Sequence, residues 1–122
     1  TRDFNFVNDT CAAFLAVASC DEALGQVVNA ASKFEISIGK TAELIAELMD
    51  ADVEITTDEK RLRPQGSEVS RLYGDNSRLC ELTGWLPTYG GLEGFRRGLA
   101  ITARWFSDPL NLARYRPGKY SI

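Results

Sequence analysis

Hydrophobic and polar positions recur along the chain with a period that changes from one segment to the next. Residues 2–7 alternate between polar and apolar side chains, which predicts a strand. Residues 9–19 are apolar nearly all round and begin beside two candidate caps, Asn8 and Asp9. This pattern predicts a deeply buried helix. The apolar run at 27–29 predicts a short buried strand.

The next segment predicts a helix followed by a strand. Residues 38–49 carry apolar side chains at helical spacing, and Ser37 is a suitable cap. Residues 53–55 alternate again, as in a half-buried strand. A strand, a helix and a further strand with short connections predict a right-handed crossover between parallel strands.

The second half of the chain begins with a polar loop at 57–67 and a possible extended segment at 69–73. Asp75 is then expected to cap a short helix that ends at Gly84. A last amphipathic helix is expected at 92–106.

These elements predict a mixed α/β fold: a small sheet with a βαβ crossover, and about four helices. The expected domain covers residues 1–107, and the polar, basic residues 108–122 are expected to form a tail.

Composition narrows the classes of protein. The chain has 122 residues, 44% hydrophobic and 25% charged, which is typical of folded globular proteins. Its net charge of −3 argues against nucleic-acid binding, and no apolar run is long enough for a membrane helix. The first residues carry no secretion signal and read as the inside of a strand, so we expect the chain to begin in mid-fold.

Charge is distributed unevenly. Residues 60–71 contain four basic side chains and one acidic side chain, Glu68. Such a stretch suits either a small anionic ligand or an ordinary solvated loop.

Cysteine and histidine usage limits the chemistry. Cys11, Cys20 and Cys80 cannot all pair within one chain, so reduced thiols in a cytoplasmic protein are the simplest interpretation. The chain has no histidine and no CxxC pair. A metal site is therefore not expected, and the commonest general base is missing.

Three motifs resemble functional signatures but fail on their context. The Gly-Lys-Thr at 39–41 lacks the earlier glycine of a phosphate-binding loop. Tyr115 and Lys119 have the spacing of a catalytic pair on a helix, but Pro117 between them prevents the helix. The glycines at 90–98 follow no predicted strand, so they indicate close helix packing rather than a dinucleotide-binding turn.

Several short segments follow one another in an order and spacing typical of one family. They are Thr1-Arg-Asp-Phe-Asn-Phe-Val-Asn-Asp9, Val27-Val-Asn29, Ile36-Ser-Ile-Gly39, Arg63-Pro64, Gly74-Asp-Asn-Ser77, Leu82-Thr-Gly-Trp85, and the helix through Leu92, Glu93 and Gly94. In them the chain resembles the C-terminal part of extended short-chain dehydrogenases that act on nucleotide sugars, the NAD-dependent epimerases and 4,6-dehydratases. The segments Phe34-Glu-Ile-Ser-Ile-Gly39, Arg63-Pro-Gln-Gly-Ser-Glu-Val69 and Tyr120-Ser-Ile are most similar to UDP-N-acetylglucosamine 4,6-dehydratases of the legionaminic-acid pathway.

The resemblance implies a set of substrate-binding residues. Arg2 and Arg63 match arginines that hold the substrate diphosphate, a task suited to planar guanidinium donors. Glu68 matches the acid that accepts hydrogen bonds from the ribose hydroxyls, and Asn29 ends a segment that approaches the nucleotide. The segment Ala30-Ala-Ser-Lys33 departs from the family, where many relatives have glycines, so its path is left open.

Two further acids belong to the same motifs. From the residues alone, Asp3 is interpreted as a partner at a strand end, and Asp9 as a helix cap rather than a site residue.

The resemblance also implies a whole enzyme, a lyase or an isomerase, in which an N-terminal Rossmann domain holds NAD and a Tyr-Lys pair performs the catalysis. No catalytic or cofactor-binding residue of that domain matches a position in this chain. The chain is therefore expected to bind the substrate and to be inactive alone. The expected substrate is a UDP-linked N-acetylhexosamine.

A homodimer or swapped assembly is expected from apolar surface that a missing domain would expose. Epimerisation and dehydration both remain open, and the alternative is a non-enzymatic α/β protein-interaction module.

Overall fold

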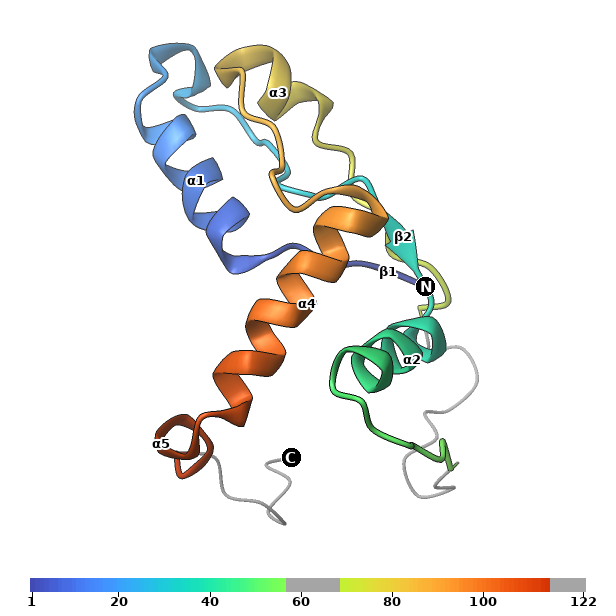
Figure 1. The fold of residues 1–122 in the computed structure, drawn as a ribbon. Helices are drawn as coiled ribbons and strands as arrows, with labels where there is room; N and C mark the ends of the chain where they lie inside the picture. The colour runs from blue at the N-terminus through green and yellow to red at the C-terminus, as the bar shows by residue number, and fades with distance from the viewer. Residues whose placement is uncertain (57–68, 115–122) are drawn as a thin grey trace.

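The computed structural model describes residues 1–56 and 69–114 of the chain (Figure 1). They form five α-helices, a short 3₁₀ helix and a two-stranded sheet, so the predicted mixed α/β class is confirmed. In chain order the elements are β1 (Arg2–Asp3), α1 (Val7–Ala18), η1 (Asp21–Ala23), β2 (Glu35–Ile36), α2 (Ile38–Leu48), α3 (Ser77–Thr83), α4 (Gly91–Ser107) and α5 (Pro109–Leu112). The predicted loop at 57–67 and residues 115–122 of the predicted tail lie outside the described residues.

The sheet is shorter than predicted and its strands run antiparallel. Arg2 of β1 lies opposite Ile36 of β2, and Asp3 lies opposite Glu35. The predicted crossover between parallel strands is wrong, because the two strands that it would join, at 27–29 and 53–55, do not form. The strand expected at 2–7 ends at Asp3, because Phe4 turns into the core and stacks on Phe95 of α4, with ring centroids 5.6 Å apart.

The predicted strands at 27–29 and 53–55 are also wrong, since neither segment is a strand in the structure. Val27 is 82% exposed and Ile55 is 65% exposed. An apolar run becomes a strand only where a neighbouring strand takes up its backbone hydrogen bonds. Alternation of polar and apolar residues does not show whether such a neighbouring strand exists.

A third segment lies beside β1. The backbone N–H of Leu72 donates to the carbonyl of Thr1 at 3.1 Å, and Arg2 Nη1 donates to the carbonyl of Val69 at 2.8 Å. Residues that are about seventy positions apart in the chain therefore meet at this short sheet.

Two helices, α2 and α3, begin or end at local signals in the sequence. Ser37 Oγ accepts a hydrogen bond from the Lys40 N–H at 3.1 Å, which confirms Ser37 as the cap of α2. Asp75 Oδ1 accepts from the Ser77 N–H at 3.0 Å at the start of α3. Gly84, with φ 70°, ends α3 in the left-handed conformation that glycine adopts without strain.

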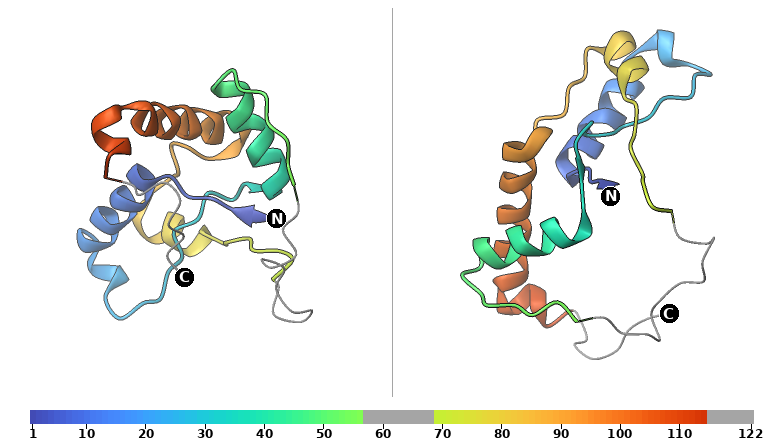
Figure 2. Two further views of the ribbon diagram at one scale, coloured as in Figure 1. Left: turned by 90° about the horizontal axis from the view of Figure 1, so that it is seen from below. Right: turned by 90° about the vertical axis from the view of Figure 1, so that its right-hand side faces the viewer.

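Two small apolar clusters form the core. One joins α1 to α3 and consists of Ala13, Leu79 and Trp85. The other joins β2, α2 and α4 and consists of Ile36, Leu44 and Phe95. Figures 1 and 2 show the corresponding arrangement, with α1 beside α3 and α2 against α4.

The predicted deep burial of the first helix is wrong. α1 buries Asp9 and Ala13, whereas Phe14 and Leu15 are 72% and 70% exposed. Both side chains are therefore left largely exposed to solvent in the described chain. None of the described helices is long and apolar enough to cross a membrane.

Candidate functional site

An open groove of about 540 Å³, lined by both polar and apolar groups, lies at the end of β1. Asp3 and Asn5 line it, together with residues 29–31 and 72–75. We call residues 29–33 the first wall, of which 29–31 line the groove and 32–33 continue the chain behind it, and residues 72–75 the second wall. Asn29, a predicted substrate-binding residue, lies in this groove, and its Nδ2 donates to the carbonyl of Asp75 at 3.4 Å.

The carboxylate of Asp3 joins β1 to both walls. Its Oδ1 accepts from the N–H and the hydroxyl of Ser32 at 3.0 and 2.5 Å. Its Oδ2 accepts from the N–H groups of Lys33 and Gly74, each at 3.2 Å. The interpretation of Asp3 as a strand-end partner is confirmed, and the identity of its partners emerges only from the fold.

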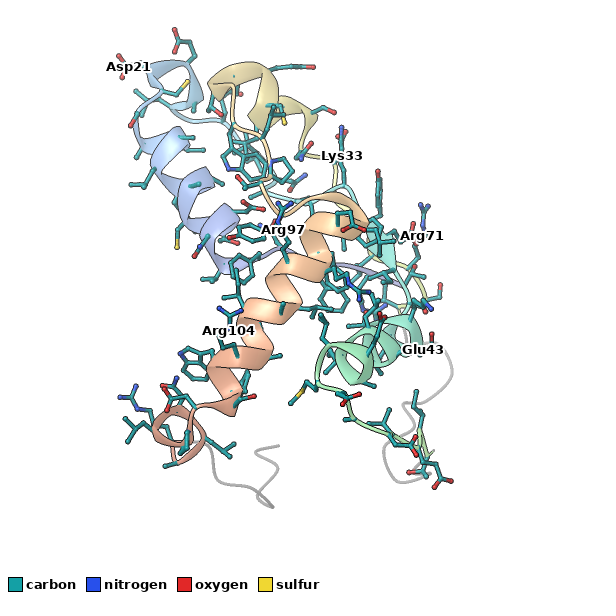
Figure 3. The ribbon with its side chains drawn as sticks, viewed as in Figure 1. Asp21, Lys33, Glu43, Arg71, Arg97 and Arg104 are labelled. Atoms are coloured by element: carbon teal, nitrogen blue, oxygen red, sulfur yellow. The ribbon has the colours of Figure 1, made fainter. Side chains whose placement is uncertain are left out.

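The first wall follows a constrained path at the position where the sequence departs from the family. Lys33 has φ 54°, a left-handed conformation that costs about 1 kcal/mol for a residue with a side chain. Its Nζ donates to Ser77 Oγ at 2.6 Å and lies 3.3 Å from Asp75 Oδ1. Lys33 therefore points to the start of α3 (Figure 3) rather than to the acidic helix α2.

Arg2 lies outside the lining of this groove. Its Nη1 donates to the carbonyls of Thr1 and Val69 at 2.7 and 2.8 Å, so the guanidinium joins β1 to the chain at 69. Arg63 and Glu68, the other two predicted substrate-binding residues, lie outside the described residues. Val69 directly follows Glu68 in the sequence. Arg2 therefore contacts the first described residue after the segment that contains Arg63 and Glu68.

Arg71, which the sequence analysis did not single out, forms a bidentate ion pair with Glu35. Its Nε donates to Oε1 of Glu35 at 2.8 Å and its Nη2 to Oε2 at 2.7 Å. The hydrogen bonds from Arg71, followed by that from the Thr1 hydroxyl, lower the pKa of Glu35 to about 2. The guanidinium also lies 5.3 Å from the ring centroid of Tyr73. One of the four basic residues at 60–71 is thus held by β2 (Figure 3).

The interpretation of Asp9 as a helix cap is wrong. Asp9 lies inside α1, is 2% exposed, and accepts from the N–H groups of Thr88 and Tyr89 at 3.0 and 2.8 Å. Its carboxylate therefore holds the loop before α4, nearly eighty residues away in the chain. A short-range capping rule cannot anticipate a partner at that separation.

The glycines at the start of α4 do not fit a dinucleotide-binding turn. Such a turn joins a strand to a helix and leaves its glycines open for a pyrophosphate. The element directly before α4 in the described chain is the helix α3 and not a strand, and a Cβ at Gly94 would lie 2.4 Å from the backbone carbon of Tyr89. A Cβ at Gly98 would lie 3.1 Å from the ring of Phe6. These glycines serve close packing, as the sequence analysis predicts.

Comparison with known proteins identifies relatives of this chain. A model of the GDP-mannose 4,6-dehydratase family matches residues 1–97. The chain is 36% identical over 107 residues to GDP-6-deoxy-D-mannose reductase of Pseudomonas aeruginosa, an alignment that covers 88% of the chain and 33% of the reductase. The chain thus spans about a third of the length of this curated relative. No solved structure gives a significant match.

Proposed function

The chain belongs to the GDP-mannose 4,6-dehydratase family, and we propose that it is the part of an NAD-dependent nucleotide-sugar dehydratase or epimerase that binds the nucleoside diphosphate of the substrate. The groove at the end of β1 carries this proposal, because it lies within the residues that the family model matches and contains Asn29. The family match also favours this function over a non-enzymatic interaction module.

In the proposed complex, Arg2 and Arg63 bind the diphosphate and Glu68 accepts hydrogen bonds from the ribose. Arginine suits the first role because its planar, permanently charged donors pair with phosphate oxygens in a bidentate way. Support for Arg2 comes from its contact with Val69, which brings its guanidinium to the end of the 57–68 segment. Asn29 is proposed to contact the nucleotide from the first wall.

The proposed nucleotide is guanosine diphosphate. The matching family and the similar reductase both carry names of GDP-linked sugars, whereas neither name contains the UDP-linked N-acetylhexosamine expected from the sequence resemblance. The legionaminic-acid subgroup therefore has no support from the comparisons, and UDP becomes the competing ligand in a binding test.

NAD is proposed to bind a separate N-terminal Rossmann domain, which also supplies the catalytic Tyr-Lys pair. This chain then contributes affinity and orientation, holding the sugar against the nicotinamide, and is inactive by itself. When bound, NAD would accept and return the hydride. The poor fit of the α4 glycines to a dinucleotide-binding turn supports this division of roles.

Calorimetric titration of the chain with GDP and with UDP tests the proposed binding. We expect GDP to bind, and Arg63→Ala to weaken its affinity about tenfold through loss of a charge-assisted phosphate contact. Arg63 is a better target than Arg2, because Arg2 also binds two backbone carbonyls of the sheet region. Arg104→Ala is the matched control, since Arg104 lies in the last turn of α4.

Three results would count against the proposal: no binding of either nucleotide to the wild-type chain, equal affinities of wild type and Arg63→Ala, or an equal loss in Arg104→Ala. Tighter binding of UDP than of GDP would restore the UDP-linked substrate predicted from the sequence.

Self-association, as a homodimer or a swapped assembly, is part of the same proposal. The exposed Phe14 and Leu15 of α1 support it, because burying them against a second chain removes apolar surface from water. Light scattering at increasing concentration should give a mass above that of the 13.5 kDa monomer. Phe14→Ser should lower this mass, and a wild-type monomer at all concentrations would exclude the assembly.

A further inference from the structure

We propose that Asp3 is the positioning residue that sets the width of the groove, by holding both walls to β1 through one carboxylate. This inference rests on the proposed function for its ligand, because the groove is taken as the nucleotide site. Asp3 itself need not touch the ligand. Its effect is to fix the distance between two segments that are about forty residues apart in the chain.

The hydrogen bonds of Asp3 are divided between the two walls. Oδ1 takes both donors of Ser32, whereas Oδ2 takes one N–H from Lys33 and one from Gly74. A carboxylate has two oxygens with about four acceptor positions, so these four donors use its full capacity. Hydrogen bonds to a charged acceptor are about twice as strong as neutral ones. No neutral side chain of this size can accept all four.

The two walls are in direct contact at one point, so they cannot move closer together there. A Cβ added to Gly74 would lie 2.3 Å from the Cβ of Ala31, so only glycine allows the observed approach. At the other end, Asn76 Nδ2 donates to the carbonyl of Ala31 at 2.8 Å. Asp3 thus holds one end of the contact between the walls and Asn76 holds the other.

Strain in the first wall makes the groove depend on Asp3. Lys33 has a left-handed backbone, and such a conformation persists only where neighbouring groups hold it. Two contacts do so: its N–H donates to Asp3, and its Nζ donates to Ser77. If Asp3 no longer accepts, the backbone of Lys33 can relax and move the wall away from Gly74.

The test compares Asp3→Asn with Glu47→Gln. Asparagine keeps the size of the side chain but has one acceptor oxygen, and its NH2 group then faces a wall N–H. Glu47→Gln removes the same charge from an ion pair with Arg96 that joins α2 to α4, away from the groove. We measure amide hydrogen exchange residue by residue, the free energy of unfolding, and calorimetric affinity for GDP.

In Asp3→Asn we expect exchange at Ser32, Lys33 and Gly74 to rise about tenfold, and GDP affinity to fall about tenfold, the effect of losing one hydrogen bond to a charged group. Exchange within α4 should stay as in wild type. Glu47→Gln should change neither the wall amides nor the affinity. A merely structural role would change the free energy of unfolding without a selective effect on the wall amides or on affinity.

Unchanged exchange at Ser32 and Gly74 in folded Asp3→Asn would overturn the proposal, as would unchanged affinity. If wild type binds no GDP, the proposed function fails, and the exchange data alone still decide whether Asp3 orders the walls. If Asp3→Asn does not fold, Ser32→Ala removes one donor to Asp3 and leaves the carboxylate in place. Ser32→Ala should raise the amide exchange rates of the walls about threefold, because one of the four hydrogen bonds to Asp3 is lost. Unchanged exchange rates in this variant would equally refute the proposed role of Asp3.

Discussion

Gly94→Ala is expected to lower the free energy of unfolding by about 3 kcal/mol, because overpacking against backbone cannot be relieved by rotating a side chain. The added Cβ would lie 2.4 Å from the carbonyl carbon and 2.7 Å from the carbonyl oxygen of Tyr89. The first turns of α4 would have to move away from the loop that Asp9 holds. Urea denaturation followed by circular dichroism measures the difference.

Gly39→Ala is the matched control. Gly39 also lies in the first turn of a helix, α2, but a Cβ there meets nothing within 4 Å. Alanine is about 1 kcal/mol better than glycine inside a helix, so this variant should be slightly more stable than wild type. Equal stability of the two variants would show that α4 does not pack on residue 89 as the structure has it.

Asp9→Ala should lower the free energy of unfolding by about 3 kcal/mol, since two backbone N–H groups would lose their acceptor. Asp9 is 2% exposed, so water cannot readily replace its carboxylate. The loop at 88–89 would loosen, and with it the contact between Tyr89 and Phe6, whose ring centroids are 4.3 Å apart. Denaturant unfolding gives the magnitude, and hydrogen exchange at residues 88 and 89 gives the location.

Asp9→Asn should have an intermediate effect, because one oxygen remains as an acceptor. Asp21→Ala, at an exposed aspartate in η1, is the control and should change the free energy of unfolding by less than about 0.5 kcal/mol. If Asp9→Ala were as mild as Asp21→Ala, the contacts of Asp9 with the loop at 88–89 would contribute nothing to stability.

The helices could be predicted from sequence because their determinants are local. The cap at Ser37, the acid at Asp75 and the glycine at 84 act within one helical turn, and α2 and α3 begin or end where these signals lie. The apolar period of α4 likewise places Phe95 in the core. The strands at 27–29 and 53–55 were mispredicted because a strand depends on a partner that the local pattern does not contain.

The candidate site was predictable only in part. The segment ending at Asn29 reaches the groove at the end of β1, whereas Arg2 lies outside its lining. The prediction that Arg2 and Arg63 converge stays a prediction, since Arg63 lies outside the described residues. Arg71 was missed, although its place among the basic residues of 60–71 was the available signal.

The sequence by itself determined the positions of α2, α3 and α4 and the family, because each depends on residues close together or on a fixed order of short motifs. Only the tertiary structure decided the direction of the sheet and the roles of Asp3 and Asp9. Both acids bind backbone N–H groups that lie between 29 and 80 positions away. A backbone N–H is the same group in every residue except proline, so the sequence carries no mark of which one a carboxylate will meet.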